Sequence, residues 1–233
     1  MSPSGSTQGI GKLSVVATPI GNLEDITLRA LRVLKEADVV ACEDTRVTKK
    51  LLSHFDISKY CVSVYGGNGP KKFERVIVLL KEGKQVAFVT DAGTPGVSDP
   101  GLEMVARARE AGADIEAVPG PSALAAAVSV AGLRAPTFTF YGFLPPKKGR
   151  EKLFNEIAAN PRASIFYESP HRILKALASL AMHLPPNRKI GLYRELTKVH
   201  EEALVGTPTE VLARLAAKPE KQRGEHVIIV EAV

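Results

Sequence analysis

Short apolar runs alternate with segments of helical period along the first half of the chain, and this alternation restricts the possible folds more than any other feature. Parallel strands need a crossover connection, usually a helix, and strands covered on both faces are apolar throughout. The pattern therefore predicts an α/β fold with a mostly parallel, doubly wound sheet. The expected strands are 13–17, 39–42, 61–64, 86–90 and 115–118, and the expected helices are 26–36, 46–54, 71–82, 102–111 and 122–130.

The alternation is interrupted between residues 131 and 136, where we place a domain boundary. Beyond it the pattern predicts a second α/β domain with a more mixed sheet. Its expected strands are 137–143, 164–167, 189–193, 202–205 and 227–231, and its helices are 151–159, 172–183 and 210–217. The expected organisation is a flexible tail (1–11), an N-terminal domain (12–135) and a C-terminal domain (136–233).

Composition is that of a soluble globular protein of 233 residues, with 45% hydrophobic residues and a net charge of +6. This charge weakly favours an anionic partner. No apolar run reaches the roughly 18 residues of a membrane span, and the first residues lack the features of a signal peptide. Two cysteines, of which Cys42 is expected to be buried, agree with a reducing, cytoplasmic setting.

Three expected strands run into loops of Gly, Pro, Asp and small hydroxyl residues, at 17–23, 91–101 and 119–123. Such loops leave backbone N–H and C=O groups open to a ligand. Ligands of open α/β sheets bind at the carboxyl ends of the strands. One loop of this kind is most often only a tight turn, but three of them favour a ligand site.

Phosphate-loop, dinucleotide-binding and zinc-protease motifs are absent, and the five histidines are scattered singly. We therefore expect no metal. Polar clusters follow three strands, at 43–46, 167–172 and 194–198, and place acidic and basic side chains at the mouth of a sheet. Each cluster alone is also explained by helix capping. Asp25 is a further possible cap, for the helix 26–36.

Together these motifs resemble the tetrapyrrole methylase family of S-adenosylmethionine-dependent methyltransferases, and within it the branch that methylates small-subunit ribosomal RNA. The resemblance runs in order through nearly the whole chain. The motifs that carry it are 17–23 with Asp25, 43–46, 91–96 with 98–101, 119–123, 142–145, 167–172 and 194–198.

The resemblance implies two α/β domains with the cofactor in the cleft between them, a homodimer, and 2′-O-methylation of a cytidine in the decoding region of 16S rRNA in the 30S subunit. It also implies which residues contact S-adenosylmethionine, with Phe166 and Tyr167 near the adenosine. The others are Thr18, Pro19, Ile20, Gly21, Asp91, Ala92, Gly93, Thr94, Pro95, Ser122 and Ala123.

Methyl transfer to a hydroxyl needs alignment, which contributes about 7–11 kcal/mol in well-oriented reactions, and a group that removes the proton or stabilises the alkoxide. Candidates for that group are Glu43, Asp44, Glu168, Glu195 and Lys198, and the sequence does not choose among them. We expect Glu195 and Lys198 at the acceptor site, with a structural ion pair as the alternative. The expected RNA contacts are Arg46, Lys147, Lys148, Arg150, Lys152, His171 and Arg172.

Two other functions fit the same residues: a methylase acting on a tetrapyrrole or another small molecule, and an RNA-binding module without turnover. The basic segment 147–152 argues mildly against the first. The chain also departs from the branch at residues 65–69, Tyr-Gly-Gly-Asn-Gly, and at Val233, where relatives often continue into a helical extension. The first departure leaves without support any role of the polar side chains usual at 65–69, and from the second we expect a grip on RNA that is weaker or differently built.

Overall fold

The structure is a computed structural model of the chain and describes residues 9–64 and 73–233. It divides into two compact units, Met1–Ser122 (unit 1) and Ala123–Val233 (unit 2). The departure at 65–69 and most of the expected tail lie outside the described residues. Gly11, assigned to the tail, already belongs to the fold, because its N–H donates to the Leu80 carbonyl at 2.7 Å.

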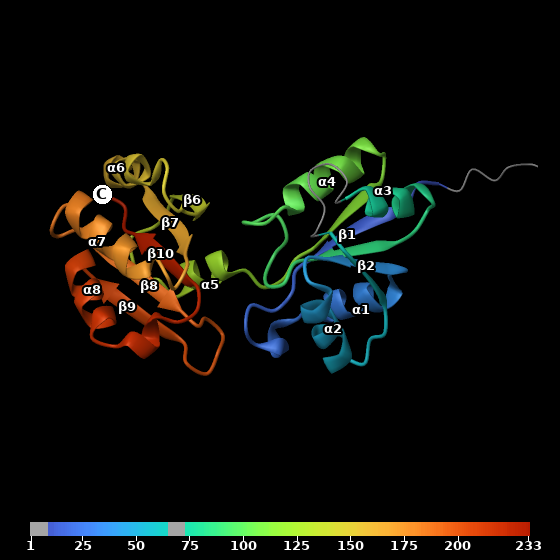
Figure 1. Cartoon of the computed structure of the whole chain (residues 1–233), viewed down its shortest axis with the longest axis horizontal. Helices are drawn as coiled ribbons and strands as arrows, with labels where there is room; N and C mark the ends of the chain where they lie inside the picture. Colours follow the sequence, from blue (N-terminus) through green and yellow to red (C-terminus); the bar gives the residue numbers. More distant parts are fainter. Residues whose placement is uncertain (1–8, 65–72) are drawn as a thin grey trace, which may run out of the picture. The chain divides into compact units, whose positions relative to one another are not determined.

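Unit 1 contains a five-stranded sheet in the order β3-β2-β4-β1-β5, with every neighbouring pair parallel. Apolar side chains on both faces of the sheet pack against helices, α1 and α2 on one side and α3 and α4 on the other (Figure 1). The predicted parallel, doubly wound sheet is confirmed. Its elements are β1 (Lys12–Val16), η1 (Leu23–Asp25), α1 (Leu28–Glu36), β2 (Val39–Cys42), α2 (Thr45–His54), β3 (Tyr60–Ser63), α3 (Glu74–Lys81), β4 (Val86–Val89), α4 (Gly101–Glu110) and β5 (Asp114–Val118).

Unit 2 contains a mixed sheet in the order β6-β7-β10-β8-β9, in which only β6 and β7 are parallel. Helices α6, α7 and α8 bury one face of it. Its elements are α5 (Ala123–Ser129), β6 (Phe138–Phe143), α6 (Arg150–Ala159), β7 (Ala163–Glu168), α7 (Ile173–His183), β8 (Ile190–Arg194), β9 (Glu202–Gly206), α8 (Pro208–Ala216), η3 (Pro219–Gln222) and β10 (His226–Val230).

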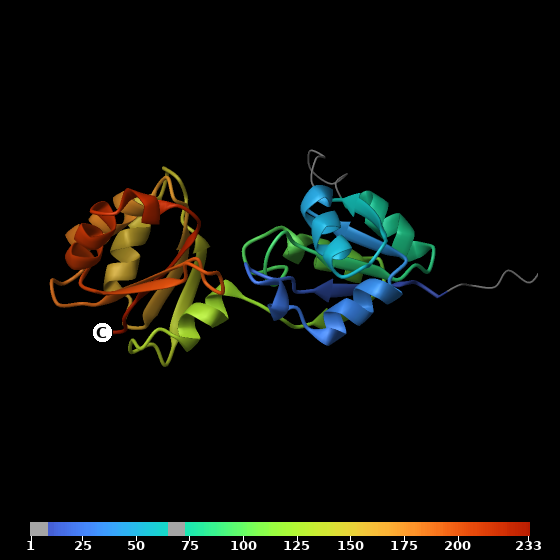
Figure 2. The ribbon, with the colours of Figure 1, turned by 90° about the horizontal axis from the view of Figure 1, so that it is seen from below.

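Helix α5 belongs to unit 2, so the division falls at 122/123 and not at the expected 135/136. The helix contacts β10, and the Tyr193 hydroxyl donates to the Ala131 carbonyl just beyond it at 3.0 Å. Figure 2 shows α5 on the side of the sheet away from α7 and α8. In the sequence, α5 continues the alternation of strands and helices of unit 1. In the structure it packs on the sheet of unit 2, whose strands come later in the chain.

Side-chain caps fix where several helices begin. The Asp44 carboxylate accepts from the Arg46 N–H at 2.8 Å and caps α2, as the capping alternative expected. Helix α1 is capped by Thr27 instead of Asp25, because the Thr27 hydroxyl accepts from the Ala30 N–H at 3.0 Å. Asp25 lies in η1.

Candidate active site

Two of the three loops after the unit 1 strands are joined by a pair of backbone hydrogen bonds. Thr18 and Gly93 exchange N–H···O bonds of 2.9 and 3.0 Å, which form an isolated antiparallel bridge. The Thr18 hydroxyl, 1% exposed, donates to the Thr90 carbonyl at 3.1 Å. The carboxyl ends of β1 and β4 are therefore held at one edge of the sheet.

The third loop is tied to the second by the Thr94 hydroxyl, which donates to the Pro121 carbonyl at 2.9 Å. Within the second loop the Asp99 carboxylate accepts from the N–H groups of Gly96, at 2.9 Å, and Gly101, at 2.6 Å. These bonds fix the loop without bulky side chains. Ser122 and Ala123 lie partly exposed, one on each side of the division between the units.

Gly93 is the residue at which backbone approach matters most. Its φ is +83°, in the left-handed region, and a Cβ there would lie 3.3 Å from Ile20 Cγ2. Any larger residue would be strained and would narrow the space between the two joined loops. The neighbouring Asp91 and Ala92 are exposed, so a polar ligand could reach this stretch of main chain.

Acidic side chains line the same edge of the sheet after β2. The Asp44 N–H donates to Asp91 Oδ1 at 3.1 Å, which brings the loops after β2 and β4 together. Glu43, Asp44 and Asp91 share one polar pocket with Thr45 and Ser63.

The two neighbouring carboxyl groups have opposite properties. Burial, with the charges of Asp91 and Asp99, raises the pKa of Glu43 to about 7. Hydrogen bonds from Arg46 lower the pKa of Asp44 to about 2. Glu43 can therefore exchange a proton near neutral pH, whereas Asp44 stays ionised and serves as a helix cap. The sequence places Glu43 among five candidates without ranking it.

In unit 2, Glu168 is fully buried between two guanidinium groups. Its carboxylate pairs with Arg150 at 2.5 Å and with Arg172 at 2.8 Å, and it accepts from the Ser169 N–H at 2.8 Å. With 0% exposure it cannot meet a substrate, so its expected catalytic role gives way to a structural one. The same pairs occupy Arg150 and Arg172, two of the expected RNA contacts.

Glu168 begins a row of ionisable residues that crosses the sheet of unit 2. His226 is in register with Glu168 on one side and Arg194 on the other, and Arg194 faces Glu202 on β9 at 3.4 Å. His226 is 0% exposed and Arg194 7%. Burial, together with the positive charge of Arg194, lowers the pKa of His226 to about 4, so His226 is neutral at pH 7.

Glu195 and Lys198 lie in the turn between β8 and β9. Their side chains pair at 3.1 Å, and Glu195 (φ +50°) and Thr197 (φ +67°) both adopt the left-handed conformation. The Glu201 carboxylate accepts from the Thr197 N–H at 2.6 Å and holds the turn. Strained non-glycine residues cluster at functional sites, but the ion pair expected as the alternative is also present.

The adjacent residues Phe166 and Tyr167 point to opposite faces of β7. Phe166 is 0% exposed and packs edge to face on Phe154 in the core, so its side chain serves the packing of unit 2, and its place near the adenosine stays a prediction. Tyr167 is partly exposed and contacts Phe140 and Phe143. It stays a predicted contact.

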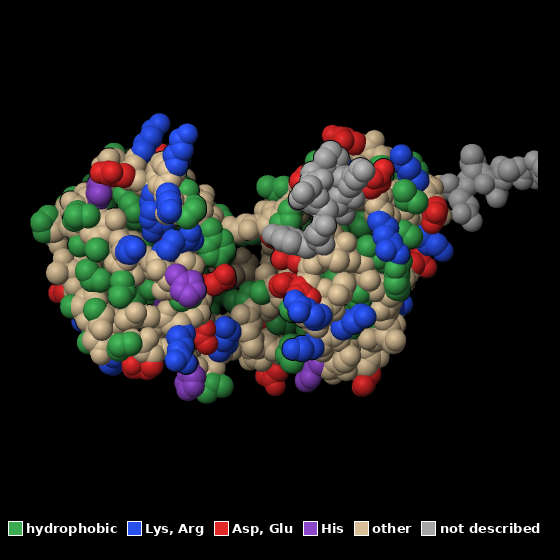
Figure 3. All heavy atoms as spheres, in the orientation of Figure 1, with side chains coloured by type: hydrophobic (Ala, Val, Ile, Leu, Met, Phe, Trp, Pro, Cys, Tyr) green, Lys and Arg blue, Asp and Glu red, His purple; other side chains and the backbone are tan. Residues whose placement is uncertain are grey.

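The expected RNA-binding side chains of unit 2 are mostly free to reach a partner. Lys147, Lys148, Lys152 and His171 are exposed. Figure 3 shows Lys and Arg side chains gathered over α6 and β7. Arg46 of unit 1 is also exposed, although it pairs with Asp44 at 2.6 Å.

Residues 9–64 and 73–233 hold no group of three His, Cys, Asp or Glu side chains placed to bind a metal ion. No helix in this part of the chain combines the length and apolar composition that crossing a bilayer requires.

Comparison with known proteins places these features in a family. A model described as Tetrapyrrole (Corrin/Porphyrin) Methylases matches residues 12–212. A Neisseria meningitidis serogroup B protein named Ribosomal RNA small subunit methyltransferase I is 47% identical over 221 residues, which are 94% of this chain and 76% of that protein. A Thermotoga maritima protein of the same name is 42% identical over 221 residues, 95% of this chain and 98% of that protein.

Solved structures of similar fold include uroporphyrin-III C-methyltransferase from Thermus thermophilus in complex with S-adenyl homocysteine. It matches with a TM-score of 0.67 and 22% identity over 95% of this chain and 97% of that one. The methyltransferase CobJ matches with a TM-score of 0.70 and 20% identity, over 96% and 95%. At this identity the likeness concerns the fold, and the predicted fold of two α/β units is confirmed.

Proposed function

The chain belongs to the tetrapyrrole methylase family, and on this premise we propose that it is an S-adenosylmethionine-dependent methyltransferase acting on ribosomal RNA of the small subunit. The finer proposal is 2′-O-methylation of a cytidine in the decoding region of 16S rRNA. The observation that carries the proposal is identity of 42–47% over nearly the whole chain to proteins named for this class of substrate. The chain would act in the cytoplasm as a homodimer.

The residues of unit 1 suit a bound S-adenosylmethionine. The main chain of Thr18–Gly21 and Asp91–Pro95 would hold it, because the Thr18–Gly93 bridge joins these two loops and Gly93 keeps clear the space beside Ile20 that a Cβ would fill. Bound S-adenosylmethionine supplies a methyl group on a sulfonium, and transfer to a ribose hydroxyl releases one proton. The protein must align the acceptor and take up that proton.

We propose that the Glu43 carboxylate accepts the proton that the ribose hydroxyl releases. Glu43 lies at the end of β2 beside Asp91, which belongs to the loop proposed to hold the cofactor. Its raised pKa of about 7 keeps a fraction of it ionised at neutral pH and makes it a stronger base than an ordinary carboxylate. Asp44 would orient the start of α2, and Glu168 would brace unit 2 through its two arginines.

Lys147, Lys148 and Lys152 are proposed to contact RNA phosphates, since all three are exposed beside the Arg150–Glu168 pair. Replacing them by Gln should lower the slope of log K against log salt by up to about 0.9 for each phosphate that the lysines no longer neutralise. An unchanged slope would assign these lysines to the solvated surface.

Glu195 and Lys198 stay proposed neighbours of the acceptor. Lys198→Met keeps the apolar stem and removes the charge from the 3.1 Å pair. If this variant methylates at the normal single-turnover rate, the Glu195–Lys198 pair has only a structural role. Weaker RNA binding with an unchanged rate would make Lys198 a phosphate contact.

The proposed function is tested by incubating the protein with labelled S-adenosylmethionine and 30S subunits or free 16S rRNA from cells that lack the modification. We expect label on one ribose, resistant to alkaline hydrolysis at that position. Label on a tetrapyrrole and none on RNA would favour the small-molecule methylase. Failure to bind S-adenosylmethionine in calorimetry would favour the RNA-binding module.

A further inference from the structure

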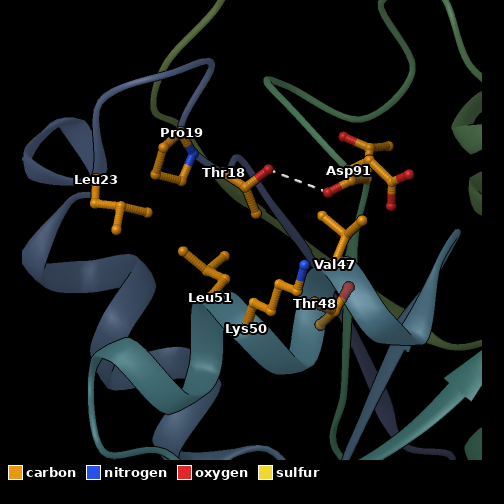
Figure 4. A pocket seen from close by; sticks show the side chains of 9 residues that line it. Thr18, Pro19, Leu23, Val47, Thr48, Lys50, Leu51 and Asp91 are labelled. Carbon is orange, nitrogen blue, oxygen red and sulfur yellow. Dashed lines mark hydrogen bonds between the residues drawn. The ribbon is translucent and has the colours of Figure 1, made fainter. Parts of the chain in front are cut away.

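A pocket of about 350 Å³ lies in unit 1 between η1 and α2, next to the loops proposed to hold the cofactor. We call it the η1–α2 pocket. Figure 4 shows Leu23 and Leu51 on one side of it, Val47 and Asp91 on the other, and the amino group of Lys50 between them. Its lining is Thr18, Pro19, Leu23, Val47, Thr48, Lys50, Leu51, Thr90 and Asp91. Among the residues of its apolar wall, Leu23, Val47 and Leu51 have no role assigned above.

The wall of the pocket is largely apolar, and part of it is open to solvent. Leu23 is 37% exposed and Val47 41%. Pro19 and Leu51 complete the wall. A volume near 350 Å³ is at the small end of ligand pockets, which span about 300–1,000 Å³, so a single ring system fits better than an extended chain. Opposed aliphatic side chains suit the two faces of a planar ring.

Polar atoms in the pocket have hydrogen-bonding capacity to spare. The Thr48 hydroxyl is 2% exposed and makes no hydrogen bond of normal geometry among the described residues. The Cys42 thiol near it is a weak acceptor. Lys50 has no ion pair with any residue that the structure describes. A buried hydroxyl and an ammonium, with the Asp91 carboxylate opposite, match a ring edge that carries both acceptors and an amino donor.

Cytosine has such an edge, with a carbonyl oxygen and a ring nitrogen as acceptors and an exocyclic amine as donor. We propose that the η1–α2 pocket receives the base of the nucleotide whose ribose is methylated, and that this base is a pyrimidine. The inference rests on the function proposed above and adds a recognition site to it. A base that is turned out of its stack is held by apolar side chains on its faces and by hydrogen bonds to its edge, and this pocket offers both.

The position of the pocket relative to Glu43 supports this assignment. Asp91 lines both the η1–α2 pocket and the polar pocket of Glu43. If the nucleobase enters the η1–α2 pocket, the ribose of the same nucleotide lies near Asp91. It is then next to Glu43, the proposed proton acceptor. Arg46 and Lys49 on α2 are exposed, and Figure 3 shows basic side chains gathered over this helix. They would meet the flanking phosphates.

Leu51→Trp tests the inference by filling the pocket. We expect the KM for 30S subunits to rise about tenfold or more, or the turnover to fall equally, while calorimetry shows unchanged affinity for S-adenosylmethionine. Val78→Trp on α3 is the matched control, since Val78 is 49% exposed and lies outside the pocket. Thr48→Val keeps the shape of the pocket, removes only the hydroxyl, and should raise the KM severalfold if the tryptophan variant does not fold.

Two results of this experiment would overturn the inference. Wild-type kinetics in Leu51→Trp and Thr48→Val would show that the pocket receives no part of the RNA. Loss of S-adenosylmethionine binding in both variants would assign the pocket to the cofactor. If the wild-type protein labels no ribose at all, the proposed function fails first, and this result is distinct from the other two.

A cross-link gives an independent readout of position. 5-Iodocytidine is placed at the acceptor nucleotide of 16S rRNA, the rRNA is assembled into 30S subunits, and the complex with the protein is irradiated and digested. We expect the label on peptides that contain Leu23, Val47 or Leu51. A cross-link confined to unit 2 would overturn the inference, even if the ribose is methylated.

Discussion

In unit 1 the ionisable side chains that follow the strands stay at the rim of the sheet, whereas in unit 2 they form a row across the sheet under its helices. Glu43 and Asp91 of unit 1 line a pocket at the strand ends. Glu168 and His226 of unit 2 are 0% exposed: Glu168 pairs with Arg150 and Arg172, and His226 lies in register between Glu168 and Arg194. The carboxyl groups at the rim can change protonation state in contact with solvent, whereas loss of the buried Glu168 carboxylate would leave Arg150 and Arg172 without their counter-ion.

The contrast suggests different roles for the two units. Unit 1 exposes main chain and one carboxyl group of raised pKa, which suits binding and proton transfer. Unit 2 aligns ionisable residues of β7, β10, β8 and β9 in one row, in which Arg194 of β8 pairs with Glu202 of β9. The substitutions below test each side of the contrast, and the largest expected effect comes first.

Glu43→Gln should lower the single-turnover rate of methylation at pH 8 by about 10²–10⁴-fold, because it removes the proposed proton acceptor. In the wild type the rate should fall as the pH drops through about 7, and this limb should vanish in the variant. Asp44→Asn is the control: the pKa of Asp44 is about 2, so this group does not titrate near pH 7 and the fall in rate should remain in the variant. If Glu43→Gln keeps the same fall in rate below about pH 7 as Asp44→Asn, a group other than Glu43 is responsible for it.

Stability should respond to Glu43 in the opposite sense to activity. Its pKa is raised from 4.5 in the unfolded chain to about 7 in the folded one, so the folded state binds more protons between these values. The wild type therefore loses stability as the pH rises from about 5 to 8. Urea unfolding of Glu43→Gln should show less of this loss.

Glu168→Gln should lower the free energy of unfolding by about 3–5 kcal/mol, because Arg150 and Arg172 would lose their buried counter-ion. Glu36→Gln in unit 1 removes an exposed pair with Arg32 and should cost less than about 1 kcal/mol. Urea unfolding measures both. If both variants lose the same free energy of unfolding, the buried pairs of unit 2 stabilise the protein no more than an exposed pair of unit 1.

Gly93→Val should lower the affinity for S-adenosylmethionine about tenfold or more in calorimetry and cost about 1–2 kcal/mol of stability. Gly132→Val is a matched control, because Gly132 also has a positive φ, of +59°, but a Cβ there meets nothing within 4 Å. It should lose similar stability and keep its affinity. Undiminished binding by Gly93→Val would place the cofactor away from this loop.

His226 should make unit 2 sensitive to mild acid. Its pKa falls from 6.5 in the unfolded chain to about 4 in the folded one, so the unfolded state binds the extra proton between these values. Stability contributed by His226 is lost as the pH falls from about 6.5 to 4, on the order of 1–3 kcal/mol. His226→Gln should flatten that part of the urea stability profile, and an unchanged profile would contradict the assignment.

The fold was predictable because its determinants are local. The runs at 39–42 and 86–90 are apolar on nearly every residue, and strands buried on both faces require this. The domain boundary was misplaced because α5 resembles its predecessors in sequence, and only its contact with β10, about a hundred residues later, assigns it to unit 2.

The site was predictable only in part, because its chemistry depends on contacts between distant residues. The loops at 17–23 and 91–101 were visible as Gly/Pro-rich strand ends, but their joining through Thr18 and Gly93 was not. Glu168 was one of five candidates for the group that removes the proton, and only its contact with Arg150, eighteen residues earlier, assigns it to a buried ion pair. The raised pKa of Glu43 likewise comes from burial and from Asp91 and Asp99 on another loop.

The strand order of unit 1 also affects how the chain is made. β1 lies between β4 and β5, so its first strand pairs only with segments that are synthesised much later. Synthesis proceeds at about 5–20 residues per second, so β5 is completed roughly 5–20 s after β1. Until β4 has been made, Leu13 and Val16, which end fully buried, have no strand to pair with. The nascent chain should therefore depend on chaperones until Val89, the end of β4, has emerged, and the sheet is complete only when Val118 follows.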